Sequence, residues 1–157
     1  MATSGLWLMA RGIDAQRQLS RDFAERTVNK RYEAVVAGHP VPPDQAWGVI
    51  DLPLAADWPN RPRQQVDPGR GKPSQTRWRL LSRGATSSRL ELEPVTGRSH
   101  QLRVHLMAIG HPILGDMLYA PPDIAQAAPR LWLHASALSF VHPHSGLPMS
   151  YTSAAPF

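Results

Sequence analysis

The chain has 157 residues, enough for one ordinary domain, and 17 basic against 12 acidic residues give it a formal net charge of +5. The absence of cysteine excludes disulfides and thiolate-bound zinc. No run approaches the roughly 18 consecutive apolar residues of a membrane span, and residues 1–11 lack the basic segment that opens a signal peptide. We therefore expect a cytoplasmic protein with no membrane segment.

The hydrophobic pattern predicts alternating strands and helices. In chain order we expect a short buried strand over 6–10, a helix from the capping residue Asp14 to about Arg26, a strand over 30–36, a short strand over 49–54, a hairpin of strands 76–81 and 88–93, a helix over 99–109 and a last strand over 131–140. The prolines cluster at 40–43, 59–73 and 121–129, which we expect to be loops. Close strand pairs are antiparallel, so the expected fold class is α+β, a mostly antiparallel mixed sheet with packed helices.

The predicted helix over 99–109 has one apolar and one strongly polar face. Its apolar residues recur at helical spacing and form a stripe suited to burial: Leu102, Leu106 and Ile109. Thr96 or Ser99 can cap the start of the helix, and Gly110 suits the left-handed position just past its end. We therefore expect this helix to pack one side against the core.

The polar face of this helix carries cations without balancing acids. Its polar residues are Arg98, His100, Gln101, Arg103 and His105, and no acidic residue occurs between Pro94 and Asp116. Arginines usually pair with an anion. We expect a buried carboxylate, a phosphate or both opposite the arginines, while Asp116 itself is predicted to be structural.

The basic residues are mostly arginine, since only Lys30 and Lys72 are lysines. Arginine recognises phosphate bidentately and stacks on bases, so this balance favours nucleic acid over a membrane surface as the partner. A GC-rich coding sequence explains the ratio of arginine to lysine equally well. It does not explain the clustering at Arg98 and Arg103.

The seven histidines do not predict a metal site. His100 and His105 lie five positions apart, which turns about 140° around a helix and puts them on different faces. His142 and His144 flank a proline and could meet a metal, but no acidic residue lies nearby in the sequence. We therefore expect no metal.

Several motifs occur together in a fixed order. They are Met-Ala-Thr-Ser-Gly at 1–5, Lys-Arg-Tyr-Glu-Ala at 30–34, Gly-Lys-Pro-Ser-Gln-Thr at 71–76, the whole run 97–116, Leu-Trp-Leu-His-Ala at 131–135 and Phe-Val-His-Pro at 140–143. Together they resemble the RluA family of pseudouridine synthases over nearly the whole chain. The stretch 51–62 resembles the A-type subgroup, whose members modify large-subunit ribosomal RNA and the anticodon stem-loop of some transfer RNAs.

The sequence departs from this family at its start. In the family a His-Arg-Leu-Asp tetrad directly precedes the Xaa-Xaa-Thr-Ser-Gly segment, which begins here at Met1. The tetrad's aspartate is the family's nucleophile, and its arginine helps to hold the target base out of the stack. We therefore expect 1–157 to be the C-terminal two-thirds of the catalytic domain, with Met1 not the natural start. The codons before Met1 should encode the tetrad and the residues that supply sheet neighbours and an anion for the arginines.

The resemblance also implies roles for individual residues. Arg103 matches the arginine that pairs with the nucleophile, Tyr32 the tyrosine beside the uracil, and Leu133 an apolar residue that flanks the base. The candidates for contact with the RNA backbone are Lys30, Arg31, Lys72 and Arg98. The alternative for each is a plain structural role: a solvated arginine, a half-buried strand tyrosine, a core leucine or a surface charge.

The implied reaction turns uridine into pseudouridine by breaking the bond from N1 to C1′ and joining C5 to C1′. It needs no cofactor or metal, and its partner is RNA. We expect a monomer, inactive as given because the nucleophilic Asp is missing. The alternatives are a non-catalytic basic RNA-binding module, that is, a degenerate synthase, and a structural ribosome-associated protein. Retention of Arg103 and Tyr32 argues against both.

Overall fold

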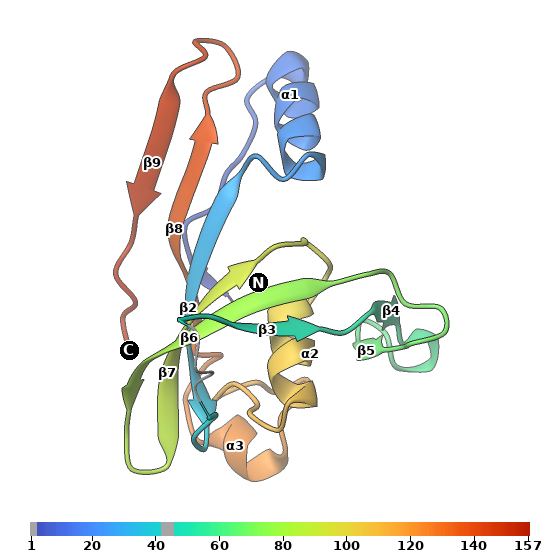
Figure 1. Cartoon of the computed structure of the whole chain (residues 1–157), viewed down its shortest axis with the longest axis vertical. Coiled ribbons are helices and arrows are strands. Elements are labelled where there is room, and N and C mark those ends of the chain that lie inside the picture. The colour runs from blue at the N-terminus through green and yellow to red at the C-terminus, as the bar shows by residue number, and fades with distance from the viewer. Residues whose placement is uncertain (1–2, 42–45) are drawn as a thin grey trace.

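The computed structural model describes residues 3–41 and 46–157 (Figure 1). Its main sheet runs in the order β1-β8-β2-β7-β6-β3, and β9 pairs with the second part of β8. The strands are β1 (Ser4–Gly5), β2 (Asn29–Ala37), β3 (Gly48–Asp51), β6 (Gln75–Arg83), β7 (Ser87–Pro94), β8 (Leu133–Val141) and β9 (Pro148–Thr152). Within this part of the chain only β1 and β8 pair in parallel. The predicted mostly antiparallel α+β fold is confirmed.

Helices cover one face of this sheet. The helices of the described chain are α1 (Ile13–Ala24), α2 (Gln101–Ala108), α3 (Pro122–Gln126) and a 3-10 turn, η1 (Trp58–Asn60). In Figure 1, α1 lies beside one end of β2 and β8, α2 lies against the other half of the sheet, and the small second sheet of β4 (Leu54–Ala56) and β5 (Gln64–Val66) projects past α2. None of these described helices is long and apolar enough to span a bilayer.

The core forms where alternate strand residues meet α2. Ala34 and Val36 of β2 and Leu90 and Leu92 of β7 are fully buried, because a strand places every second side chain on the same face. Leu106 of α2 packs on them, as the helical stripe predicts. A second cluster lies under α1: Leu19, Val28 and Phe140, with Leu8, Leu138 and Met149 against them. The site described below lies between these two clusters.

The opposite face of the sheet carries ion pairs between neighbouring strands and is not covered by the described helices. Arginine and glutamate side chains meet across β2, β6 and β7: Arg31–Glu93, Arg77–Glu93, Arg79–Glu91 and Arg89–Glu33. These arginine side chains keep 30–46% of their surface exposed, so each pair contributes little stability by itself. The pairs let this face meet water while the helices cover the other.

The strand predicted over 6–10 is wrong. The strand observed in this region is β1, which ends at Gly5. Residues 6–11 are irregular, and Trp7 and Met9 are 70% and 71% exposed. Gly5 has φ +98°, and an added Cβ there would lie 2.4 Å from the carbonyl oxygen of Ala135. This left-handed residue ends the strand after the close approach to β8, so the apolar pattern of the next residues does not continue the sheet.

The predicted helix over 99–109 is confirmed as α2, with a different start. Neither Thr96 nor Ser99 caps it; the N-cap residue is His100, in the left-handed region at φ 54°, and its side chain makes no capping hydrogen bond. Instead the side-chain oxygen of Gln101 accepts a hydrogen bond from the backbone N–H of Arg98 at 3.0 Å. At the other end Gly110 has φ +83°, as expected past a helix.

Other boundaries differ because short elements leave weak patterns. The strand predicted over 49–54 is split into β3 and β4, which belong to different sheets. The loops predicted at 59–73 and 121–129 contain β5 and α3, and α3 has proline in its first turn, where the missing N–H costs nothing. The strand β9 was not predicted. Pro42 and Pro43 of the loop predicted at 40–43 lie outside the described residues.

Candidate active site

A cavity of about 590 Å³ opens between α1 and α2 on the helix-covered face of the sheet. We call it the Tyr32 pocket. Five of the seven candidate catalytic and RNA-contact residues line it, namely Lys30, Tyr32, Arg98, Arg103 and Leu133. They come from β2, the turn after β7, α2 and β8, so residues far apart in the sequence meet here.

Tyr32 and Leu133 share the face of the sheet that forms the pocket floor. Tyr32 lies opposite Ala135, and Ala34 lies opposite Leu133, so the alternation of side chains puts both on one face. The β2–β8 register shifts between Arg31 and Tyr32, an irregularity of the kind that re-aims side chains next to active sites. The pocket therefore offers a planar ring beside a buried aliphatic side chain, which suits a flat base.

Burial sets the protonation state of Tyr32. The phenol is largely removed from water, and this raises its pKa above the ordinary value of 10.0. At neutral pH the hydroxyl is therefore protonated. It can donate a hydrogen bond into the pocket. To accept a proton from a substrate, it must first give its own proton to another group.

Arg103 is held by a buried carboxylate. Its Nε donates to Oδ2 of Asp116 at 2.8 Å, and its Nη2 donates to Oδ1 at 2.5 Å. The side chain of Asp116 is 1% exposed, and its Oδ1 also accepts the backbone N–H groups of Leu118 and Tyr119. This bidentate pair fixes the orientation of the guanidinium.

The anion expected opposite Arg103 is thus supplied from within the chain. For Arg103 this corrects the expectation that residues before Met1 supply the anion; for Arg98 that expectation stays a prediction. The pair uses Nε and Nη2, which leaves Nη1 of Arg103 as the nitrogen free to address a further acceptor. Asp116 therefore acts as a positioning residue for Arg103.

A buried polar cluster anchors the start of α2. Gln101, His105 and Thr76 are 3%, 0% and 0% exposed. The amide nitrogen of Gln101 donates to Thr76 Oγ1 at 3.0 Å, and Thr76 Oγ1 lies 2.9 Å from His105 Nδ1. His105 Nε2 lies 3.0 Å from the carbonyl oxygen of Leu52, which only a donor can satisfy. His105 is therefore the Nε2–H tautomer, and its Nδ1 accepts from Thr76.

The sequence analysis missed the positioning role of this cluster. Gln101 and His105 were grouped with the polar face of the helix, yet both are buried. Burial lowers the pKa of His105 below its ordinary value of 6.5, mainly because the cation would lose its hydration. The usable signal was that His105 stands beside Leu106 and next to the apolar stripe, where a polar residue needs an internal partner.

Two candidates for backbone contact do not line the Tyr32 pocket. Arg31 extends from the opposite face of β2, where its Nη1 lies 2.6 Å from Glu93 Oε2 and its guanidinium lies 4.7 Å from the ring centre of Trp47. Lys72 is exposed beside β4, and its backbone N–H donates to the carbonyl of Leu54. The structure gives Arg31 a place in the ion pairs of the far face and Lys72 a place on the small sheet.

The histidines lie in separate environments. His100 Nδ1 is 2.7 Å from the hydroxyl of Tyr119, whereas His105 belongs to the cluster under α2. The rings of His142 and His144 lie 6.1 Å apart in the turn between β8 and β9. Over residues 3–41 and 46–157, no three His, Asp or Glu side chains come together as a metal-binding group.

Comparison with known proteins shows the family to which the chain belongs. The family model described as RNA pseudouridylate synthase matches residues 1–108. The chain therefore belongs to the RNA pseudouridylate synthase family.

Named relatives agree with this assignment. The chain is 50% identical to the dual-specificity RNA pseudouridine synthase RluA of Escherichia coli strain K12 over 158 aligned positions, which cover the whole chain and 71% of that protein. The protein of the same name from Yersinia pestis is also 50% identical and is covered to 75%. Among solved structures, human RNA Pseudouridylate Synthase Domain Containing 1 has a TM-score of 0.77 at 30% identity, over 93% of this chain and 62% of that one. Human RNA Pseudouridylate Synthase Domain Containing 4 has a TM-score of 0.71 at 25% identity, over 92% and 64%.

Proposed function

We propose that this chain forms the uridine-binding wall of an RNA pseudouridine synthase. The observation that supports it is the convergence of Tyr32, Arg103 and Leu133 on one pocket. The reaction releases and retains a base, so the pocket has to hold uracil while its N1–C1′ bond is exchanged for a C5–C1′ bond. A base reaches such a pocket by leaving the helical stack, which costs a few kcal/mol and is offset by contacts in the pocket.

Each of the three residues has a distinct role in this proposal. The uracil lies between the ring of Tyr32 and the side chain of Leu133. Nη1 of Arg103 pairs with the nucleophilic carboxylate, which lowers the pKa of that carboxyl group and fixes its orientation. C5 loses a proton and N1 gains one as the base is rejoined, and in this proposal the Tyr32 hydroxyl relays the C5 proton, giving up its own proton as it takes that one. No atom is gained or lost and nothing is oxidised, so the reaction requires no cofactor or metal.

Among the described residues, those that line the Tyr32 pocket include no acidic side chain that could serve as the nucleophile. Asp116 is committed to Arg103 and to two backbone N–H groups, so it is not available to attack a sugar carbon or a base. We propose that the aspartate of the family's His-Arg-Leu-Asp tetrad supplies this carboxylate, and that the 157 residues alone bind RNA without turnover.

The proposed substrates are large-subunit ribosomal RNA and the anticodon stem-loop of transfer RNA. The support is the resemblance of residues 51–62 to the A-type subgroup and the dual specificity that the names of the bacterial relatives state. The net charge of +5 suits a polyanionic partner.

The test compares two proteins made from the gene. The 157-residue chain is assayed for tritium release from an anticodon stem-loop whose uridines are tritiated at C5, and release should stay at background. A longer chain that carries the tetrad should release tritium, and its tetrad Asp→Ala variant should not. Turnover by the 157 residues alone would contradict the proposed role of the tetrad. RNA binding without turnover in the longer chain would favour the non-catalytic RNA-binding module.

A further inference from the structure

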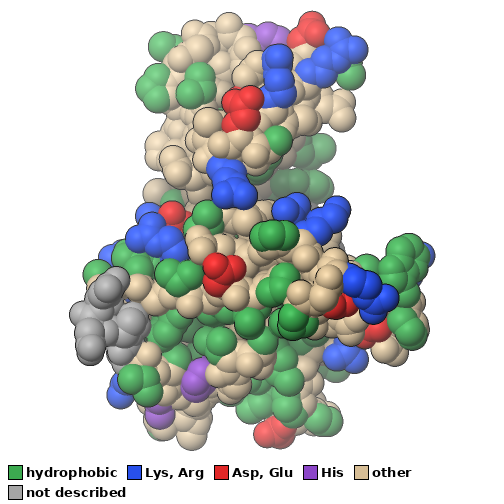
Figure 2. Space-filling view, turned by 45° about the vertical axis from the view of Figure 1, so that its right-hand side comes forward, with side chains coloured by type: hydrophobic (Ala, Val, Ile, Leu, Met, Phe, Trp, Pro, Cys, Tyr) green, Lys and Arg blue, Asp and Glu red, His purple; other side chains and the backbone are tan. Residues whose placement is uncertain are grey.

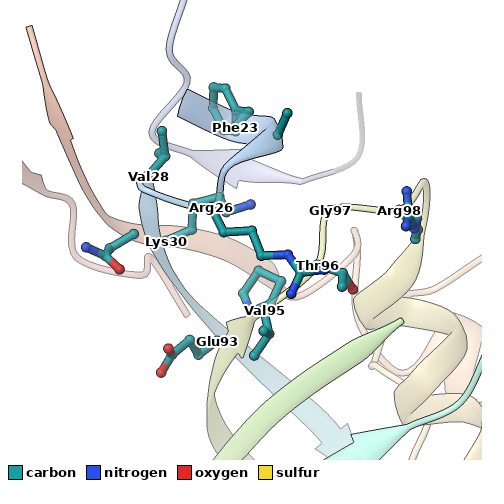
Figure 3. A pocket seen from close by; sticks show the side chains of 12 residues that line it. Phe23, Arg26, Val28, Lys30, Glu93, Val95, Thr96, Gly97 and Arg98 are labelled. Carbon is teal, nitrogen blue, oxygen red and sulfur yellow. The ribbon is translucent and has the colours of Figure 1, made fainter. Parts of the chain in front are cut away.

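A second cavity of about 370 Å³ adjoins the Tyr32 pocket (Figure 3). We call it the Arg26 pocket. Both cavities are lined by Phe23, Lys30, Pro94, Thr96, Gly97 and Arg98, so they meet along this shared wall. Arg26, Val28 and Val95 line only the second cavity. The bond changes of the proposed reaction use none of these residues; Lys30 and Arg98 are general candidates for contact with the RNA backbone, and Arg26 and Phe23 have no role so far.

Lys30 stands at the junction of the cavities as a cation without an anion. It also lines a third, smaller cavity beside Ala135, and Gly97 lies close to its ammonium group, 3.6 Å from Nζ to a Cβ built at that glycine. Burial lowers the pKa of Lys30 below its ordinary value of 10.5. No carboxylate lies within ion-pair distance of it in residues 3–41 and 46–157, and its packing partner is the ring of Phe23, with Nζ 5.4 Å from the centroid.

The acid nearest to this cavity is already neutralised. Glu93 lines the Arg26 pocket, but its Oε2 lies 2.6 Å from Nη1 of Arg31 and 3.3 Å from Nη1 of Arg77. Figure 3 shows its carboxylate turned away from Arg98 and Gly97. The charge of Lys30 is therefore directed at open space and not at Glu93.

Arg26 adopts an unusual backbone conformation at the rim of the same cavity. It follows the end of α1 with φ +61°, in the left-handed region where glycine is the common residue. In Figure 3 its side chain reaches across the pocket toward Thr96 and Gly97. A side chain kept at a position that favours glycine indicates that the side chain has a use there.

We propose that the Arg26 pocket binds the nucleotide next to the target uridine, with its phosphodiester on Lys30, Arg98 and Arg26 and its base against Phe23. This rests on the proposed function, because a uridine held in the Tyr32 pocket remains joined to its neighbours through phosphodiesters. The shared wall places the cations where such a link would pass. Phe23 is 42% exposed, which leaves its ring available for stacking, and stacking on an aromatic ring accepts any base.

The test measures binding of short single-stranded RNA probes to the 157-residue chain by fluorescence anisotropy. One probe carries a single central uridine and all its phosphodiesters. Further probes replace one phosphodiester by a neutral methylphosphonate, on the 5′ side of the uridine, on its 3′ side or at the end of the probe. We expect one of the two flanking replacements to weaken binding about tenfold, the effect of removing one charged hydrogen bond, and the terminal replacement to have little effect.

Variants connect this effect to the pocket. Lys30→Met should weaken binding of the unmodified probe about tenfold and remove the difference between the two flanking methylphosphonates. Arg26→Gly should also weaken binding while the melting temperature stays equal or rises, because glycine relieves the left-handed conformation. Each variant should lower the salt dependence of binding by about 0.7 for each phosphate that is no longer neutralised. Arg17→Ala is the matched control, since Arg17 is an exposed arginine of α1 that lines neither pocket.

The outcomes separate this proposal from the proposed function. A flanking methylphosphonate penalty that persists unchanged in folded Lys30→Met and Arg26→Gly would overturn the Arg26 pocket as a nucleotide site. A probe with an abasic central position that binds as tightly as the uridine probe would instead count against the Tyr32 pocket and the proposed function. Loss of binding in Arg17→Ala equal to that in Arg26→Gly would show general charge attraction and would overturn the pocket assignment.

Discussion

At the scale of single residues, buried hydrogen bonds orient the side chains of the site. Asp116 orients Arg103, and Gln101, Thr76 and His105 fix the first turn of α2, which carries Arg103. Tyr32 and Leu133 take their places from the register of β2 and β8. The placement of Tyr32 and Leu133 and the orientation of Arg103 are therefore set by the fold before substrate binds, as electrostatic preorganisation requires.

Arg103 should matter more for turnover than Lys72. In a longer chain that carries the tetrad Asp, Arg103→Met should reduce kcat/KM by a larger factor than Lys72→Met, because it removes the partner of the nucleophile. It also leaves Asp116 buried without its cation, which costs about 3 kcal/mol or more of stability. Measuring kcat/KM and the free energy of unfolding for both variants checks this.

Arg103→Lys separates catalysis from folding. Lysine keeps a positive charge near Asp116 but cannot reproduce the bidentate fork, so the variant should fold and still lose most turnover. Turnover equal to that of the wild type in Arg103→Lys, or equal losses in Arg103→Met and Lys72→Met, would mean that Arg103 does not act on the nucleophile.

His105 should make the fold less stable in mildly acidic solution. Its folded-state pKa lies below the unfolded value of about 6.5, mainly through burial, with smaller opposing effects of the Leu52 carbonyl and Asp51. As the pH falls below that value, the unfolded chain takes up a proton that the folded chain does not, so the free energy of unfolding decreases. Urea denaturation at several pH values should show this slope, and His105→Gln should flatten it. An unchanged slope in the variant would contradict the assignment.

At the scale of elements, close approach of the backbones decides how β1 meets β8. Leu6 N–H donates to the carbonyl of Ala135 at 3.0 Å, and Gly5 allows the two chains to come together there. β8 in turn pairs with β2, which carries Tyr32 and Lys30. β1 is therefore linked through β8 to the strand that carries Tyr32.

Gly5→Ala should destabilise the protein more than Gly12→Ala. Both glycines have positive φ values, 98° and 94°, so an alanine is strained at either position, by about 1–3 kcal/mol. At Gly5 the new Cβ would also lie 2.4 Å from the Ala135 carbonyl oxygen, whereas at Gly12 nothing lies within 4 Å. Chemical denaturation should give Gly5→Ala a loss larger by about 1–3 kcal/mol. Equal losses of unfolding free energy in the two variants would show that β1 and β8 can move apart at little cost to accommodate the new Cβ.

At the scale of the whole molecule, the charges divide between two faces of one sheet. The far face neutralises its arginines with glutamates, while Lys30, Arg26 and Arg98 lie on the side of the pockets. The space-filling view in Figure 2 shows Lys and Arg side chains gathered around the waist between the two halves of the molecule. The monomeric state and the cytoplasmic location stay predictions from the sequence.

RNA binding by the 157-residue chain should be weak and should fall steeply with salt. Each phosphate neutralised by a cation releases counterions, so the logarithm of the association constant should fall linearly with the logarithm of the salt concentration, by about 0.7 per neutralised phosphate for single strands. Anisotropy titrations with a uridine-containing stem-loop at several salt concentrations check this. Affinity that is independent of salt would rule out backbone contacts as its source.

The sequence by itself determined the fold class, most of the main strands and α2, and the resemblance to the family named five residues that line the Tyr32 pocket, together with Arg31 and Lys72, which do not. Strand alternation and helical spacing are local patterns, and the motif of 97–116 brings Arg103 with its own helix, so neither needs long-range information. The same local reasoning placed Gly110 correctly past the end of α2.

Only the tertiary structure decided which charges meet. Arg31 and Lys30 are neighbours in the sequence, but the pleat of β2 sends Arg31 to the far face and Lys30 to the junction of the pockets. Asp116 lies 13 residues beyond Arg103, outside its helix, and reaches it only through the fold. Pairing across a sheet and burial under a helix depend on contacts distant in the chain, and these fix the partner of Arg103 and leave Lys30 without one among the described residues.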